Sequence, residues 1–141
     1  MIDDFKINDL PFPQVQELED IIPFLCKSVG LSKDIELKTL TILFTESKYG
    51  KGVTPDEIAA QIDVKAKDVH AILERLMTIG IARKSRDRYV LRETSMSMTL
   101  DAILDDIFLI SRNLKRACVI VDRKATKNAV TKLLQDWKNV S

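Results

Sequence analysis

Apolar residues recur three and four positions apart along most of this chain, which predicts a protein built mainly from helices. A first stripe, from Pro13 to Gly30, contains Pro23, where we expect a kink or a break. Ser32 is predicted to cap a second helix, in which apolar residues are dense enough to imply burial on most sides; they are Ile35, Leu37, Leu40, Ile42, Leu43 and Phe44.

Two short helices joined by a tight turn are predicted between Thr54 and Gly80. Thr54 and Glu57 are spaced as a capping box, in which each side chain bonds a backbone amide of the first turn, and Pro55 suits the first helical position. The apolar positions are Ile58, Ala59 and Ile62 in the first helix, then Val69, Ile72, Leu73 and Leu76 in the second. Gly80 is suited to end the second helix.

A short basic hairpin follows these helices. Residues 81–91 alternate into two strands around the turn Ser85, Arg86 and Asp87, and Val53 is expected to form a short strand beside them. The ten residues 83–92 include five cations: Arg83, Lys84, Arg86, Arg88 and Arg92.

A long helix is predicted after a polar link, Thr94 to Thr99, with Ser97 or Thr99 as its cap and an end near Arg123. One of its faces repeats with heptad spacing through Leu100, Ile103, Ile107, Ile110, Leu114, Ala117 and Val121. A second stripe contains Leu104, Phe108 and Cys118. Exposing such a seam would cost ~1.5–3 kcal/mol for each large side chain, so we expect it to be covered. Either the N-terminal helices of the same chain cover both stripes, or one stripe packs on its own domain and the other pairs with a second copy. A last helix, near Thr126 to Lys138, follows.

Residues 35–92 resemble the winged helix-turn-helix of MarR-like and TrmB-like regulators. The resemblance rests on a small residue at Ala59, an apolar turn residue at Val64, and the buried face Val69, Ile72 and Leu76 of the recognition helix. Asp63 replaces the usual Gly of the turn, and Lys65 replaces the usual Ser or Thr cap; Asp tolerates a left-handed backbone, so the turn is retained. The resemblance implies binding to duplex DNA and transcriptional control.

Charge is distributed unevenly along the 141 residues, although the net charge is only +1. Residues 1–47 carry four Lys and Arg against nine Asp and Glu, residues 48–92 carry ten against six, and residues 93–141 carry eight against six. A locally basic surface is sufficient to neutralise phosphates, so the modest net charge does not exclude a nucleic-acid partner.

Helical geometry turns one side of the recognition helix outward if its apolar residues face the core. From this side we assign DNA contacts to Lys65, Lys67, His70, Ala71 and Glu74. In the hairpin we assign them to Arg83, Lys84, Arg86 and Arg88, because the wing contacts the DNA backbone in the fold that this segment resembles. The alternative for His70 is that it is a solvated helix residue without a functional role.

Paired half-sites require two recognition helices about one DNA turn apart, ~34 Å, and a 25-residue helix of ~37 Å is a suitable spacer. We therefore expect a homodimer held by the C-terminal helices, through Leu100, Ile103, Ile107, Ile110, Leu114 and Val121. The expected architecture is mainly helical with a small β wing. It comprises an N-terminal helical extension (1–31), a winged helix-turn-helix domain (32–93) and a C-terminal dimerisation region (94–141).

Two other functional classes are a protein-binding module and an enzyme. A winged-helix module that binds other proteins, within a transcription or chromosome-maintenance complex, would use the same helices, and Asp68 and Glu74 favour it. An enzyme is disfavoured because the sequence has no phosphate-binding glycine loop, a single His and no nucleophile beside a base. No metal-ligand spacing occurs, and no cofactor is expected.

The remaining expectations concern the thiols, a ligand and the location. Cys26 and Cys118 are interpreted as two buried structural thiols, with a redox link as the alternative. A small effector between the long helix and the N-terminal helices would agree with the resemblance, but no convergent polar set marks a pocket. The start, MIDDFKINDL, lacks the features of a secretion signal, and no apolar run is long enough for a bilayer, so a cytoplasmic protein without a membrane segment is expected.

Overall fold

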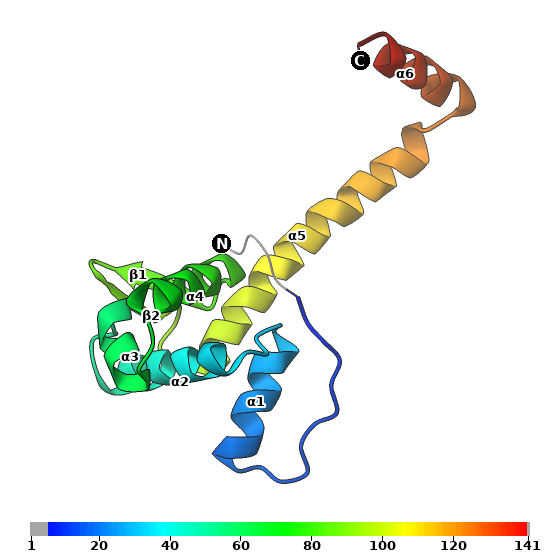
Figure 1. The fold of residues 1–141 in the computed structure, drawn as a ribbon. Helices are drawn as coiled ribbons and strands as arrows, with labels where there is room; N and C mark the ends of the chain where they lie inside the picture. Colours follow the sequence, from blue (N-terminus) through cyan, green and yellow to red (C-terminus); the bar gives the residue numbers. More distant parts are fainter. Residues whose placement is uncertain (1–5, 141) are drawn as a thin grey trace. The chain divides into compact units, whose positions relative to one another are not determined.

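The computed structural model describes residues 6–140 of the chain. It is mainly helical, with one small antiparallel sheet of two strands. Along the chain the elements are α1 (Leu18–Ser28), α2 (Asp34–Tyr49), α3 (Pro55–Ile62), α4 (Ala66–Ile79), β1 (Ala82–Ser85), β2 (Arg88–Leu91), α5 (Met96–Lys124) and α6 (Lys127–Val140). Figure 1 shows this order from blue to red.

The first helix is shorter than the apolar stripe predicts. It begins at Leu18 rather than near Pro13, and the described residues before it have no regular structure. The helix continues through Pro23, so of the two expectations, a kink or a break, the break does not occur. The backbone amide of Asn8 donates to the Ser28 carbonyl at 2.8 Å, which connects the segment before α1 to the end of that helix.

Helix α2 begins at Asp34 with Lys33 at the N-cap position, which corrects the prediction that Ser32 caps it. The Lys33 amide donates to the Glu36 carboxylate at 3.0 Å, so a side chain inside the helix satisfies its first amide. Burial is confined to one face, which includes Leu40 and Leu43, whereas the other four apolar residues expected in the core are only half-buried: Ile35, Leu37, Ile42 and Phe44.

The turn between α3 and α4 is built as predicted. Asp63 adopts the left-handed conformation, with φ 55° and ψ 57°, and ends α3. Lys65 stands at the N-cap of α4 without a side-chain cap, and Gly80 ends α4 with φ 95°. The aspartate therefore performs the backbone role for which glycine is usual at such a turn.

Strands β1 and β2 pair with Ala82 opposite Leu91 and Ser85 opposite Arg88, so Ser85 belongs to a strand and the turn is only Arg86 and Asp87. Val53 forms an antiparallel bridge with Tyr89, which confirms the expected short pairing beside the hairpin. Gly52 is required for that approach: a Cβ there would lie 2.5 Å from the Tyr89 carbonyl oxygen, and its φ of 94° also disfavours other residues.

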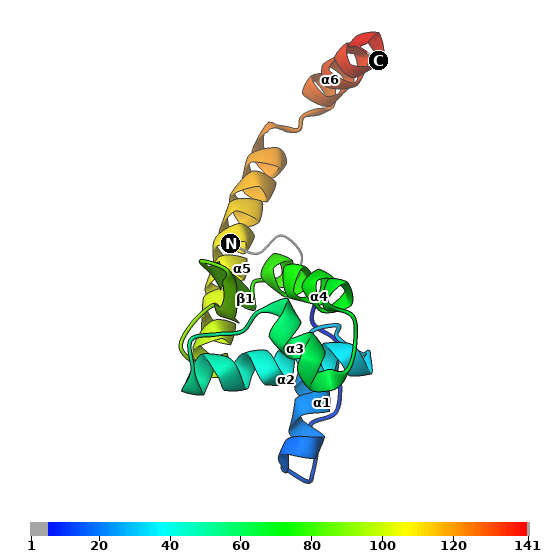
Figure 2. The ribbon, with the colours of Figure 1, turned by 60° about the vertical axis from the view of Figure 1, so that its left-hand side comes forward.

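Helix α2 lies at the centre of this part of the chain, where it contacts α1, α3, α4 and β2 (Figures 1 and 2). The fully buried side chains come from each of these layers, and the largest are Tyr89, Leu31, Leu43, Ile58, Leu73, Leu76, Leu91 and Ile103. The outer side of α4 and the β1–β2 turn lie outside this core.

The chain divides into two compact units within α5. The N-terminal unit extends to Leu104 and the C-terminal unit begins at Asp105. The first turns of α5 belong to the N-terminal unit, because Thr99 and Ile103 are buried there. Helix α5 begins at Met96, and its first turn is capped by Ser95, which accepts the Met98 amide at 3.0 Å; the predicted caps Ser97 and Thr99 lie inside the helix.

Candidate nucleic-acid interface

The outward side of α4 consists of the residues that helical geometry selects. Lys67, His70, Ala71 and Glu74 are exposed, as is Lys65 at the N-cap, while Val69, Leu73 and Leu76 are buried on the opposite side. No hydrogen bond or ion pair joins the side chain of Lys65 or Lys67 to another residue in the described part of the chain. These two cations are therefore available to an external partner.

Glu74 is bound to the hairpin rather than presented alone to solvent. Its carboxylate accepts the Tyr89 hydroxyl at 2.6 Å, and His70 Nε2 lies 3.4 Å from the same oxygen. Burial raises the pKa of Tyr89 to about 12, and the hydrogen bond and charge of Glu74 act in the same direction, so the phenol stays protonated and donates near neutral pH. Glu74 thus connects α4 to β2, a role that the sequence pattern did not indicate.

Arg88 forms a second connection, between β2 and the start of α3. Its Nη1 lies 2.8 Å from Glu57 Oε1 and donates to the Gly52 carbonyl at 3.2 Å. Thr54 caps α3 by accepting the Glu57 amide at 3.2 Å, as predicted. Glu57, however, does not complete the capping box: its carboxylate accepts the Thr54 hydroxyl at 3.1 Å and pairs with Arg88.

Among the other cations of the hairpin segment, Arg92 is half-buried and the other three are exposed: Arg83, Lys84 and Arg86. Arg83 Nε donates to the Arg92 carbonyl at 3.3 Å, and Lys84 Nζ lies 5.5 Å from the Tyr89 ring centroid. Arg86 occupies the turn in a left-handed conformation, with φ 62°. No hydrogen bond or ion pair links Arg86 to another described residue, so its guanidinium is the most available charge of this hairpin.

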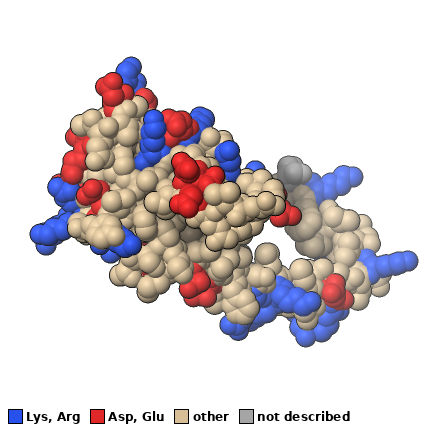
Figure 3. Space-filling view, turned by 90° about the horizontal axis from the view of Figure 1, so that it is seen from below, with Lys and Arg blue, Asp and Glu red and all other residues tan. Residues whose placement is uncertain are grey.

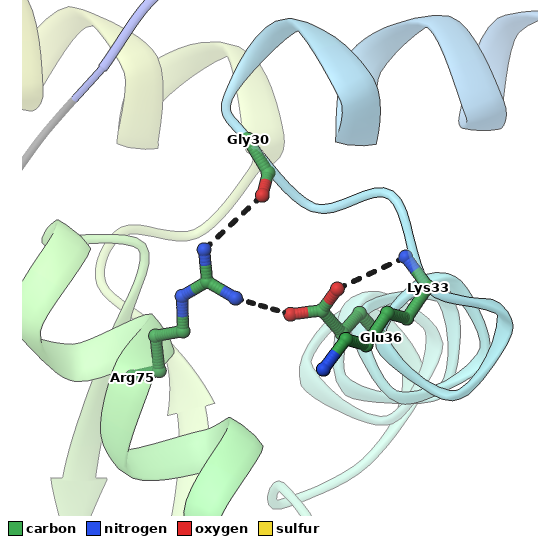
Figure 4. A network of polar contacts seen from close by, with 4 residues as sticks. All are labelled: Gly30, Lys33, Glu36 and Arg75. Atoms are coloured by element: carbon green, nitrogen blue, oxygen red, sulfur yellow. Dashed lines mark hydrogen bonds and ion pairs between the residues drawn. The ribbon is translucent and has the colours of Figure 1, made fainter.

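A buried carboxylate fixes α4 from its other side (Figure 4). Arg75 pairs through Nη1 with Glu36, whose side chain is only 4% exposed, and donates from Nη2 to the Gly30 carbonyl at 3.1 Å. The other Glu36 oxygen accepts the Lys33 amide. This network joins α4 to α2 and to the α1–α2 loop, so it orients the helix whose outer side is exposed. Its partners are far apart in sequence, and no local pattern indicates them.

The residues assigned to a subunit interface do not share one environment. Ile103 is 2% exposed inside its own chain, which corrects its assignment as a contact for a second copy. Leu100 is exposed to 40% and also lines an apolar cavity of about 180 Å³ with Leu25, Val29 and Leu40. Ile107 is half-buried, whereas Ile110, Leu114 and Val121 are exposed to 45%, 62% and 58%.

The two cysteines also differ. Both are free thiols, but only Cys26 is buried, and the expectation that Cys118 is buried is wrong. Burial, together with the smaller effect of the negative charge of Glu36, raises the pKa of Cys26 to about 11. Cys118 lies on the exposed part of α5.

In the described part of the chain, no group of three or more His, Cys, Asp or Glu side chains is placed to hold a metal ion. No helix within residues 6–140 has both the length and the apolar composition that a membrane crossing requires.

Comparison with models of known protein families, with curated proteins and with solved structures finds no match for this chain.

Proposed function

We propose that this chain is a winged helix-turn-helix regulator of transcription that binds duplex DNA as a homodimer. In this proposal α3 and α4 are the helix-turn-helix, α4 is the recognition helix, and the β1–β2 hairpin is the wing. The observation that carries it is the position of the hairpin: Glu74 and Arg88 hold it against α4 and α3, while Arg86 at its turn stays exposed.

The residues that we assign to DNA contact divide into two groups, according to whether their side chains already bond to other residues of the chain. Lys65, Lys67 and Arg86 have no internal partner among the described residues and would contact phosphates or base edges. Arg88 and Glu74 would instead position the wing, because their charged groups already bind Glu57 and Tyr89. Ala71 would allow close approach of the helix to a groove, and His70 and Lys84 would contribute at its edge.

The homodimer is supported by the apolar side chains that the C-terminal unit leaves exposed. They include Phe108, Ile110, Leu114, Val121, Leu133, Leu134 and Trp137. Exposed apolar surface of this extent usually marks an interaction site. We propose that the matching surface of a second copy covers it, which would present two α4 helices to successive half-sites.

The second candidate is a winged-helix module that binds proteins. It is favoured by one observation: Arg88 forms an ion pair with Glu57 within the chain, so the charge that the hairpin offers to phosphates is smaller than the sequence indicates. Neither candidate assigns a catalytic role, and both place the protein in the cytoplasm.

Binding to random-sequence duplex DNA, measured by fluorescence anisotropy over a salt series, separates the candidates. We expect binding that weakens steeply with salt, because phosphate contacts release counterions. Arg86→Ala and Lys67→Ala should each reduce the slope of log K against log salt by ~0.9.

Lys27→Ala is the matched control, since Lys27 is also an exposed helical lysine but lies in the last turn of α1. Its slope should equal that of the wild type. If the wild type shows no affinity for duplex at low salt, the proposed function is wrong and the protein-binding module becomes the better interpretation.

A further inference from the structure

The exposed part of α5 carries four cations on a single face. At 3.6 residues per turn, Arg112, Lys115, Arg116 and Arg123 fall within an arc of about 100°, which we call the α5 cationic stripe. The apolar positions Ile110, Leu114 and Val121 lie on the opposite side of the helix, whereas the exposed side chains of Phe108 and Val119 fall within the angular range of the stripe. All four cations are exposed.

The cations of this stripe have no acidic partner. No hydrogen bond or ion pair connects the side chain of any of the four to another residue of the described chain. Asp101 and Asp105 share their side of α5 but precede Arg112 by more than a turn, and Asp122 lies at the edge of the stripe. Like charges three and four residues apart destabilise a helix, so this arrangement is unfavourable until an anionic partner binds.

The composition of the C-terminal unit agrees with such a partner. From residue 105 onward the chain has eight Lys and Arg against four Asp and Glu. Figure 3 shows the C-terminal helices, toward the right of the view, with more blue than red side chains. Three of the four cations of the stripe are arginines, whose planar guanidinium matches the oxygens of a phosphate.

We propose that the α5 cationic stripe is a second surface for the phosphate backbone of nucleic acid, separate from α4 and the hairpin. Eleven residues of helix separate its ends, a length of ~16 Å, which corresponds to about five base pairs of duplex. This inference rests on the proposed function, because a second copy seated on the apolar side of α5 leaves the stripe facing outward. An anionic membrane surface is the competing partner.

The test uses the full-length protein with three arginines of the stripe replaced together, Arg112→Ala, Arg116→Ala and Arg123→Ala. In the same salt series on random duplex, we expect the slope of log K against log salt to decrease by ~2 to 3. Lys115→Ala should decrease the slope by ~0.9. The factor by which affinity falls between 50 and 200 mM salt should then be about threefold smaller than for the wild type.

Lys124→Ala is the matched control for Lys115→Ala, because Lys124 is on the same exposed helix but about 120° away from Arg112 around its axis. Circular dichroism and sedimentation of every variant should equal the wild type. Those readings show that neither the helix nor the self-association has changed.

The outcomes distinguish this inference from the proposed function. If Arg86→Ala reduces the slope but the triple variant does not, the stripe contacts no phosphate and only the further inference is overturned. If the wild type binds no duplex, both are overturned. Binding of the wild type, but not of the triple variant, to vesicles of phosphatidylserine and phosphatidylcholine in the absence of duplex binding would assign the stripe to a lipid surface instead.

Discussion

Helices α4 and α5 have the same apolar periodicity, yet their apolar faces have different surroundings. In α4, Val69, Leu73 and Leu76 are completely buried, whereas in the C-terminal part of α5 Leu114 and Val121 are more than half exposed. The period of the pattern specifies which side chains share a face. Whether that face is covered depends on the other elements that the chain brings to it. The N-terminal unit thus contains its own core, and the C-terminal unit presents exposed apolar side chains.

The sharpest test of this difference replaces one leucine by alanine in each unit. Leu76→Ala removes a fully buried side chain and should lower the free energy of unfolding by about 2–5 kcal/mol, through lost burial and the cavity that remains. Leu114→Ala should cost far less in dilute protein, because its side chain is exposed to 62%. Urea unfolding measures both.

Repeating the Leu114→Ala measurement at high protein concentration tests the homodimer. The wild type should gain stability with concentration, and the variant should gain less, because association stabilises the folded state by mass action. Equal stabilisation of the two proteins would exclude Leu114 from any interface between copies.

A second test compares charges. Arg75→Met leaves the Glu36 carboxylate buried with only the Lys33 amide as a partner, so we expect a loss of about 3 kcal/mol in the free energy of unfolding. Lys115→Ala, in the C-terminal unit, removes an exposed unpaired charge and should change stability by less than ~0.5 kcal/mol. Thermal and urea unfolding report the two values.

The double variant Glu36→Gln with Arg75→Met is the control for the charge itself. Because it removes the unpaired carboxylate, it should recover part of the stability that Arg75→Met loses. If the single and double variants are equally unstable, the cost arises from packing and not from the buried charge.

The smallest expected effect concerns the two thiols. The pKa of Cys26 is raised by burial from 9.0 to about 11, so the folded state favours the protonated thiol. Its contribution to stability is complete below about pH 9 and is lost as the pH rises from 9 to 11, with a total of about 3 kcal/mol, of which about 1 kcal/mol is lost between pH 8.5 and 10. Cys26→Ala should show a weaker decline of unfolding free energy over this range than the wild type does.

Cys118→Ala provides the comparison from the other unit and should retain the pH dependence of the wild type, because Cys118 is exposed. Tyr89 acts in the same direction as Cys26 between about pH 10 and 12, so measurements at pH 8.5 to 10 isolate the thiol best. Native Cys118 should also react with iodoacetamide well before Cys26. An identical pH profile for wild type and Cys26→Ala would contradict the assignment.

Much of the local structure could be predicted because its causes lie within a few residues. The cap at Thr54, the left-handed Asp63 and the end of α4 at Gly80 each depend on neighbours in the sequence. The caps of two helices are not where the sequence predicts them. The prediction for α2 is Ser32, but Lys33 occupies the N-cap position. The prediction for α5 is Ser97 or Thr99, but Ser95 caps that helix. The helix register, and with it the exposed side of α4, did not depend on these details.

What the amino-acid order alone determined is the position of the helices and hairpin, and which residues of α4 share its outer side, because backbone periodicity is a local property. Only the tertiary structure decided that Glu74 binds Tyr89, that Arg88 binds Glu57 and that Arg75 binds Glu36. These partners lie 15 to 39 residues apart, and a charged side chain selects among the groups that folding brings within hydrogen-bonding distance. The same reason explains why Ile103 is buried while Leu114, on the same stripe, is not.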